Sequence, residues 1–153
     1  MASEKIDASP TKEFFIDMLV RDIDLDRAIL DLIDNSVDAW VENRSDDNKF
    51  IKINFDSNQF IIHDNCGGMD FELAKTYAFR FGRPKERATT PNSVGQFGVG
   101  MKRTLFKLGK SFKIVSRKDD KCFQVSVDVN NWKSSDTWNF DIEVTAFFKT
   151  VVA

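Results

Sequence analysis

Cysteine and histidine are scarce in this chain of 153 residues, and their scarcity excludes two classes of protein. Cys66 and Cys122 are the only cysteines, too few for the disulfide framework of a small secreted domain, so we expect reduced thiols. One histidine, His63, and no metal-ligand spacing between the cysteines leave no zinc site to predict. We interpret His63 as a structural residue at the end of a strand.

Long apolar runs are missing as well. No stretch approaches the roughly 20 apolar residues that a membrane-spanning helix needs, and the first residues carry no apolar segment of a signal peptide. Internal repeats and low-complexity tracts are also absent. We therefore expect a cytoplasmic protein that has no membrane partner.

The chain does have enough apolar residues for one core. At 42% hydrophobic and 30% charged residues, a length of 153 supports one hydrophobic core and is too short for two. We expect a flexible N-terminus over residues 1–10 and a single domain over 11–153, whose C-terminal end could be incomplete. The fifteen phenylalanines are assigned mainly to packing between helices and sheet.

Positive charge is concentrated in one segment. Residues 80–118 contain eleven lysines and arginines against Glu86 alone, a net charge of +10 that leaves −12 for the rest of the chain. A local positive field favours a triphosphate ligand, and it leaves nucleic acid open as a partner. Because few aromatic residues are interleaved with these charges, a platform for stacking bases is not indicated.

Apolar periodicity and turn residues predict an α+β domain. Helices are expected at 12–20, from a cap at Asp24 or Asp26 to about 42, at 71–79 and at 101–108. Strands are expected at 50–55, 59–64, 111–117, 123–129 and 138–148. A polar, basic loop containing Pro84 and Pro91 separates the third helix from the fourth and is typical of a lid, placed at about 80–98. The expected fold is a two-layer sandwich, with helices on one face of a mixed, mostly antiparallel sheet.

Asp31, Asn35 and Asp38 form a polar stripe on the predicted helix over 24–42. At about 3.6 residues per turn they share one narrow face, and apolar residues occupy the opposite arc. These apolar residues are Ile29, Leu32, Ile33, Val37, Trp40 and Val41. We predict that the apolar arc packs against protein. A carboxylate one turn before a carboxamide can polarise a water and hold a hard cation, although a solvated helix face can have the same composition.

Two glycine-containing segments follow this helix. Residues 63–69, His-Asp-Asn-Cys-Gly-Gly-Met, place Asp64 at the end of a predicted strand and before a glycine turn. Residues 93–102, Ser-Val-Gly-Gln-Phe-Gly-Val-Gly-Met-Lys, space three glycines before a helix, where backbone N–H groups can meet phosphate. A glycine loop alone is weak evidence, but the polar helix, the strand-end acid and the glycine loop in this order form a specific constellation.

In order and spacing, the three segments resemble the N, G1 and G2 boxes of the GHKL superfamily of ATPases. That superfamily includes gyrase B, the ninety-kilodalton heat-shock chaperones, the MutL proteins, the MORC proteins and the sensor histidine kinases. The resemblance covers residues 26–117, and the motifs at 34–39 and 95–102 are most similar to the gyrase, chaperone and MORC-like branches. It implies a Bergerat-type fold that binds ATP between helices and lid.

The resemblance also implies roles for the polar residues. Asp31 stands where the family has its catalytic base, and Asn35 stands where an amide oxygen coordinates Mg²⁺, the ion that bridges the phosphates. Asp64 would accept a hydrogen bond from the adenine amino group. Asp38 would support the adenine side through water or a backbone N–H, unless it is simply a solvated acid.

The glycine segments are implied to surround the base and the phosphates. Gly68 would let the backbone approach the adenine, and Met69 would pack on it. Lys102 would add a positive charge near the phosphates, with a plain surface lysine as the alternative. The phosphate loop would comprise Gly95, Gln96, Phe97, Gly98, Val99 and Gly100.

Three positions depart from the family pattern. Asp31 replaces a glutamate that is one methylene longer, and a loss of reach of about 1.5 Å can slow hydrolysis on the order of 100-fold. Cys66 replaces the first G1 glycine. A side chain is tolerated at this position only if the backbone φ of Cys66 is negative. The glycine-threonine pair of a late strand has no clear match, and Thr145 is only a weak candidate.

Together these observations predict a Mg²⁺-dependent ATP-binding module. We expect a slow ATPase whose nucleotide state closes the lid and controls association with a second subunit or a partner protein. The gyrase and chaperone branches bring a lysine or arginine from a following domain onto the γ-phosphate. Here a partner or a longer protein would have to supply that residue, or turnover is intrinsically slow. Two alternatives stay open: an ATP-gated interaction module that does not hydrolyse ATP, and a nucleic-acid-binding protein that uses the basic segment 80–118.

Overall fold

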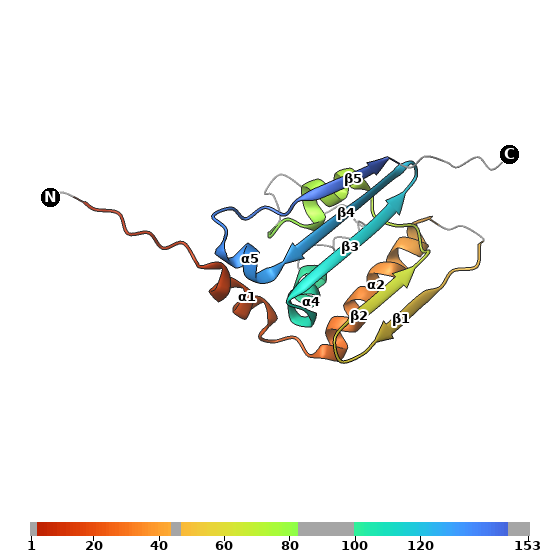
Figure 1. The fold of residues 1–153 in the computed structure, drawn as a ribbon, viewed down its shortest axis with the longest axis horizontal. Coiled ribbons are helices and arrows are strands. Elements are labelled where there is room, and N and C mark those ends of the chain that lie inside the picture. Colours follow the sequence, from red (N-terminus) through yellow and green to blue (C-terminus); the bar gives the residue numbers. More distant parts are fainter. Residues whose placement is uncertain (1–2, 44–46, 83–99, 147–153) are drawn as a thin grey trace.

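The structure, a computed structural model, describes residues 3–43, 47–82 and 100–146 (Figure 1). The predicted α+β class is confirmed, with α2 and α4 on one side of the strands. In chain order the elements are α1 (Lys12–Val20), α2 (Leu25–Asn43), β1 (Ile51–Phe55), β2 (Phe60–Asp64), α3 (Phe71–Leu73), the π-helix η1 (Ala74–Ala78), α4 (Gly100–Leu108), β3 (Ser111–Lys118), β4 (Lys121–Asp128), α5 (Val129–Ser134) and β5 (Ile142–Ala146). Within the described residues, no helix is long and apolar enough to span a bilayer.

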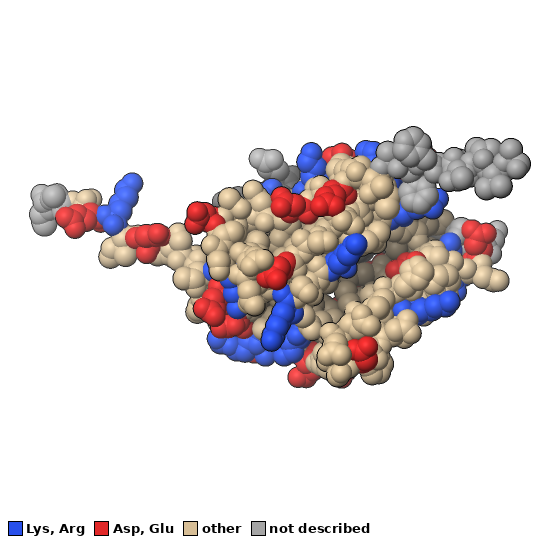
Figure 2. Space-filling view, in the orientation of Figure 1, with Lys and Arg blue, Asp and Glu red and all other residues tan. Residues whose placement is uncertain are grey.

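The strands form two antiparallel sheets where one mixed sheet was expected. In the hairpin β1–β2, Ile51 pairs with Asp64, and the second sheet has the order β3-β4-β5. The two sheets meet where the Met69 N–H donates to the Ser116 hydroxyl at 2.7 Å. The strands β2 and β3 are not paired, and Figure 2 shows a furrow between the two sheets.

The hairpin forms where the turn residues predicted it. The Asp56 carboxylate accepts hydrogen bonds from the backbone N–H groups of Asn58 and Gln59, at 2.7 and 3.0 Å. These bonds, which lower the pKa of Asp56, make an Asx-type turn that sets the register of the strands on either side. The hairpin delivers Asp64, its last strand residue, to the side on which α2 lies.

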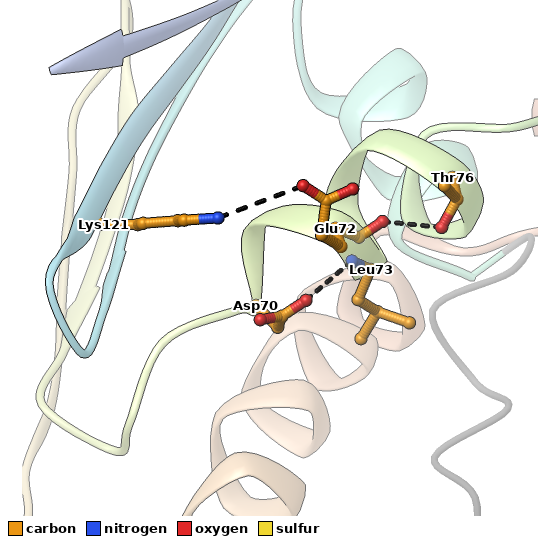
Figure 3. A network of polar contacts seen from close by, with 5 residues as sticks. All are labelled: Asp70, Glu72, Leu73, Thr76 and Lys121. Carbon is orange, nitrogen blue, oxygen red and sulfur yellow. Dashed lines mark hydrogen bonds and ion pairs between the residues drawn. The ribbon is translucent and has the colours of Figure 1, made fainter.

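The segment predicted as one helix over 71–79 divides into α3 and η1. Asp70 caps α3 by accepting from the Leu73 N–H at 2.9 Å, and Lys121 of β4 lies 4.0 Å from the Glu72 carboxylate (Figure 3). The Thr76 hydroxyl donates to the Glu72 carbonyl at 2.6 Å, a side-chain bond that competes with the regular backbone ladder. The apolar periodicity predicted that this segment is helical, but it did not predict the change from α-helix to π-helix at Ala74.

The C-terminal half has one helix where no element was predicted and one strand that is shorter than expected. The stretch between β4 and β5 contains a helix, α5, because the Asp128 side chain caps it by accepting from the Asn131 N–H at 2.8 Å. The strand expected over 138–148 is shorter in the described residues and covers Ile142–Ala146. Trp138 and Phe140, expected in that strand, instead pack edge-on against other aromatic rings.

The main core lies between the three-stranded sheet and the helices of its inner face. Phe123 and Val125 on the central strand β4 are each 1% exposed. The cluster around them comprises Ile16, Ala74, Phe106, Val127, Val129 and Trp132. Most of the described phenylalanines contribute to this packing, and Phe14 and Phe55 are exposed exceptions.

The N-terminal helix is attached to the far end of the chain by Lys12. This lysine is 7% exposed, and its ammonium donates to the backbone carbonyls of Trp132, Ser135 and Thr137 and to the Ser135 hydroxyl, at 2.5 to 2.8 Å. It also lies 4.7 Å from the centre of the Trp132 ring. A buried cation therefore joins α1 to α5 and to the segment that leads into β5.

The packing face of α2 differs in part from the prediction. The arc expected to pack against protein includes Val37, Trp40 and Val41, which are 38%, 45% and 51% exposed. The other members of this arc, Ile29, Leu32 and Ile33, are half-buried, and so are the residues of the polar stripe. The buried Ala28 and Ser36 lie on the side where the polar stripe adjoins this half of the arc. A helical wheel assumes that the whole apolar arc is the packing face, and here the packing face comprises half of that arc together with the polar stripe.

Candidate functional site

Asp64 is held in place by two hydrogen bonds that use both carboxylate oxygens. The Ser36 hydroxyl of α2 donates to one oxygen at 2.9 Å, and the Cys66 N–H donates to the other at 2.8 Å. Ser36 is 7% exposed and comes directly after Asn35 in the chain. This pair of bonds connects the polar helix to the strand-end acid, two of the three motifs that the sequence singled out.

The first turn of α4 lies against the same helix. A Cβ added to Gly100 would be 3.5 Å from the Asp31 carboxylate, an ordinary van der Waals distance, so the start of α4 lies close to this acid. One turn later, the buried Thr104 hydroxyl donates to the Ala28 carbonyl at 3.0 Å. These contacts fix α4 on α2 and place the N-terminus of α4, which carries partial positive charge, beside Asp31.

The turn after Asp64 requires glycine at two successive positions. Gly67 and Gly68 have φ of +134° and +68°, conformations that other residues rarely adopt. A Cβ on Gly68 would also collide with the Arg117 carbonyl of β3. Gly68 therefore permits a close approach of the turn to β3, and Met69, which follows, packs against the main core.

Cys66 meets the condition that its position in this turn imposes. Asp119 is the only described residue other than glycine with a positive φ, so the Cys66 backbone is one that a side chain tolerates. The thiol is 2% exposed, and burial, followed by the nearby charge of Asp64, raises its pKa. Cys66 is thus a small buried residue whose sulfur stays protonated.

Lys102 is not the surface residue that was considered as an alternative. Its side chain is 1% exposed, and its ammonium donates to the Ala78 carbonyl at the end of η1, at 2.8 Å. The Phe81 ring centre lies 5.7 Å from the ammonium. Burial lowers the pKa of Lys102 to about 8.

Asn35 and Asp38 are half-buried on the inward side of α2, with Asp31 one turn before Asn35. Within the described residues the Asn35 amide makes no hydrogen bond, so its oxygen is available to a ligand. Mg²⁺ commonly keeps several waters and takes one or two protein oxygens together with substrate phosphates, which suits a single carboxamide. Among the described residues, no three His, Cys, Asp or Glu side chains gather into a metal site.

Several predicted residues lie outside the described part of the chain. They are Gly95, Gln96, Phe97, Gly98 and Val99, together with most of the lid placed at 80–98. Of the phosphate loop, the structure describes Gly100 alone. Thr145, the weak candidate for the late threonine, is exposed on β5 and pairs with Cys122, in the sheet that does not contain Asp64.

The basic residues of the segment 80–118 that the structure describes do not form one patch. Lys102 is buried and the Arg103 guanidinium donates to the Leu19 carbonyl at 3.2 Å, whereas Lys107, Lys110 and Lys113 are exposed. On the face seen in Figure 2, lysines and arginines are interspersed with acidic residues. This distribution does not add support for a nucleic-acid surface.

A cavity of about 580 Å³ opens between α2 and the start of β1. Its lining includes Val37, Trp40, Phe50 and Cys66, and none of the predicted nucleotide contacts that the structure describes lines it. We therefore define the candidate site by the contacts among the three motifs and not by this cavity.

Three hydroxyl residues of the site were missed in the sequence. Ser36, Thr104 and Ser116 each connect two elements: α2 with β2, α4 with α2, and β3 with the glycine turn. Their signal was weak, since a single Ser or Thr on an apolar face is common. Ser36 alone could have been inferred, from its place beside Asn35 in the polar helix.

The comparison with known proteins agrees with this geometry. The profile of the family described as "Histidine kinase-, DNA gyrase B-, and HSP90-like ATPase" matches residues 23–151. The chain therefore belongs to this ATPase family, and the predicted GHKL membership is confirmed. A human protein, MORC family CW-type zinc finger protein 1, is 33% identical over 96 residues, which are 61% of this chain and 9% of the human protein. The chain is thus similar to a small part of that protein, in agreement with the MORC-like branch.

Proposed function

We propose that this chain is a Mg²⁺-dependent ATP-binding module that hydrolyses ATP slowly. Family membership indicates ATP binding. The observation that carries the proposal for this site is that α2 contacts both other motifs, through Ser36 and Asp64 on one side and Asp31 and Gly100 on the other. A ligand placed on the inward face of α2 would meet all three.

Adenine recognition is assigned to Asp64. Its two oxygens are oriented by Ser36 and the Cys66 N–H, and each oxygen keeps a further lone pair for the adenine amino group. Guanine carries a carbonyl in place of that amino group, so the carboxylate would repel it. Gly68 and Met69 would lie along the base, and Asp38 would support this side through water.

The triphosphate is assigned to the N-terminus of α4 and the loop before it. Gly100 begins α4, whose first backbone N–H groups have no partner within the helix and favour an anion. Asn35 would hold Mg²⁺, and the ion would neutralise charge on the phosphates. The residues Gly95, Gln96, Phe97, Gly98 and Val99 would complete the cradle.

Hydrolysis is assigned to Asp31 as the base that orients a water toward the γ-phosphate. Its carboxylate lies against Gly100 at the N-terminus of α4, so the helix backbone is close to the base. This proximity offsets part of the reach that the shorter side chain lacks. We further propose that nucleotide controls association with a second copy or another protein through the segment 80–98.

Isothermal titration with ATP, ADP and GTP, each with and without Mg²⁺, tests the binding proposal. We expect ATP to bind more tightly with Mg²⁺ and GTP to bind at least 10-fold more weakly, because a lost hydrogen bond to a charged group costs about 1.5–3 kcal/mol. Asn35→Ala should remove the Mg²⁺ effect and Asp64→Asn the preference for adenine. Asp34→Asn, an exposed acid on the same helix, is the matched control. Equal affinity of wild type for ATP and GTP would refute the adenine assignment.

Phosphate release separates an ATPase from a module that only binds ATP. Wild type should release phosphate slowly, and Asp31→Asn should lower the rate by roughly 100-fold, since general-base catalysis contributes about 10²–10⁴. Asp34→Asn should leave the rate unchanged. The short side chain of Asp31 favours the non-hydrolytic alternative, and tight ATP binding without release above background would establish it.

A further inference from the structure

Lys102 is the most buried ionisable side chain near the candidate site, and neither its burial nor its partner fits a phosphate contact. At 1% exposure, its ammonium has the Ala78 carbonyl at 2.8 Å and the Phe81 ring at 5.7 Å. Within the described residues, no carboxylate lies within ion-pair distance of it. The described neighbours of this ammonium are therefore a backbone carbonyl and the face of an aromatic ring.

This burial costs free energy. Desolvation alone accounts for the lowered pKa of Lys102, and no charged group contributes to the shift. A buried cation without an opposite charge is unfavourable, and an apolar side chain of similar length would fill the same space without that cost. Ionisable groups kept at such a cost are often functional.

The helical period places Lys102 away from the face of α4 that meets α2. Gly100 and Thr104 are one turn apart, and both contact α2, at Asp31 and Ala28. Lys102 lies midway between them in sequence, about 200° around the helix from each, so its side chain leaves α4 on the opposite side. On that side it reaches the end of η1, where a free helix carbonyl attracts a cation.

We propose that Lys102 is a positioning residue of the nucleotide site, acting through the Ala78 carbonyl and not on the phosphates. The first turn of α4 is then held from two sides, by α2 at Gly100 and by η1 at Lys102. This arrangement sets the N-terminus of α4 against Asp31. The effect of Lys102 on nucleotide binding rests on the proposed function, because the helical turn that Lys102 holds is the one assigned to the triphosphate.

Nuclear magnetic resonance of the Lys102 side chain tests where the ammonium lies. Its pKa is followed through the ¹³Cε shift, assigned with Lys102→Met, in the free chain and with saturating ATP and Mg²⁺. We expect the pKa to stay within about 0.5 of its value in the free chain, since the ammonium keeps its carbonyl partner. A contact with the triphosphate would raise it by more than 1, because a polyanion favours the charged form, and that result would overturn the proposal.

Backbone amide shifts of the nucleotide-free chain test the positioning itself. Lys102→Met should move the signals of Gly100 and Asp31, while Lys107→Met, an exposed lysine of the same helix, should leave them in place. Unmoved signals in Lys102→Met would overturn the proposal. Because this measurement uses no nucleotide, its failure is distinct from a failure of wild type to bind ATP, which would refute the proposed function. Lys102→Arg, which keeps the charge, should restore the Gly100 and Asp31 signals toward wild type.

Affinity measured at two salt concentrations gives a third readout. The loss of ATP affinity in Lys102→Met should be equal at 50 and 500 mM salt, since a buried bond is little screened. A phosphate-contacting lysine would instead show a loss that shrinks at high salt. Such shrinkage would contradict the positioning role.

Discussion

At the scale of single residues, the site depends on a few positions where backbone geometry admits one kind of residue. Gly68 has a positive φ and lies against a β3 carbonyl, while Cys66, two residues earlier, has a negative φ and tolerates a side chain. The departure from the family pattern at Cys66 is therefore harmless to the turn. A side chain at Gly68 would instead disrupt the turn, because it would collide with the Arg117 carbonyl.

Gly68→Ala tests this distinction. A left-handed conformation costs a non-glycine residue about 1–2 kcal/mol, and the collision with the Arg117 carbonyl adds about 1–3 kcal/mol. Gly82→Ala is the matched control, since Gly82 has a φ of +88° and nothing within 4 Å of an added Cβ. Urea denaturation should show a clearly larger loss for Gly68→Ala. Equal losses would mean that the approach to β3 is unimportant.

At the scale of elements, the polar stripe of α2 faces inward and part of its apolar arc faces solvent. The close contacts of this helix are made by Ala28 with α4 and by Ser36 with β2. A helix that carries a ligand site needs its functional groups on the covered side, and apolar residues then remain exposed on the other. The amphipathic pattern indicated the two faces correctly, and the prediction that the apolar face packs against protein was wrong for Val37, Trp40 and Val41.

Two substitutions on α2 test this orientation. Ala28→Leu should lower the free energy of unfolding by about 1–3 kcal/mol, because Ala28 is fully buried against α4 and a larger side chain overpacks the contact. Val41→Ser, on the apolar arc, should cost only about 0.5 kcal/mol, since Val41 is 51% exposed. Chemical denaturation measures both. A helix oriented as the hydrophobic pattern predicted would give the reverse order.

Lys102, which links α4 to η1, makes the free energy of unfolding depend on pH. The pKa of Lys102 is about 8 in the folded chain and 10.5 when exposed, so between these values the unfolded chain binds more protons and stability rises with pH. From pH 7 to pH 9 the expected gain is about 1 kcal/mol. Denaturation of wild type and Lys102→Met across this range measures it, and the variant should lack the gain.

The pH range of this experiment ends at pH 9 because a second group, the Cys66 thiol, affects stability above that pH. Cys66 has a raised pKa, so above the ordinary thiol pKa of 9.0 the unfolded chain loses a proton that the folded chain keeps. Stability then falls with rising pH, in opposition to the effect of Lys102. Identical pH profiles for wild type and Lys102→Met below pH 9 would contradict the assignment to Lys102.

At the scale of the whole molecule, a few side chains connect parts that are distant in sequence. Lys12 joins the first helix to carbonyls 120 or more residues later, and Ser116 joins the second sheet to the turn after the first. Since β2 and β3 do not pair, the two sheets are held together by their shared helices and by this turn.

Lys12→Met tests the first of these connections. Removing the ammonium leaves several carbonyls without their charged donor, and we expect a loss of about 2–3 kcal/mol in the free energy of unfolding, with faster amide hydrogen exchange in α1. Lys5→Met, in the exposed N-terminal segment, should change neither quantity. Unchanged exchange in α1 would show that aromatic packing alone holds this helix.

Much of the fold could be predicted, because local rules suffice for it. The bounds of α1, the hairpin with its Asp56 turn and the α4 helix follow from caps, alternation and periodicity. The π-helical turn, the cap that starts α5 and the separation into two sheets could not be read from the pattern, since each depends on single hydrogen bonds or on which strands meet.

The sequence by itself determined the family and the three motifs, because residue type and spacing are properties of the linear chain. Tertiary structure alone decided how those motifs meet: that Ser36 orients Asp64, that Asp31 faces Gly100, and that Lys102 turns away to Ala78. The physical reason is that burial and hydrogen-bond partners are set by neighbours distant in sequence. The sequence shows that a lysine stands in the first turn of a helix, but it does not show whether the ammonium contacts a phosphate or a carbonyl.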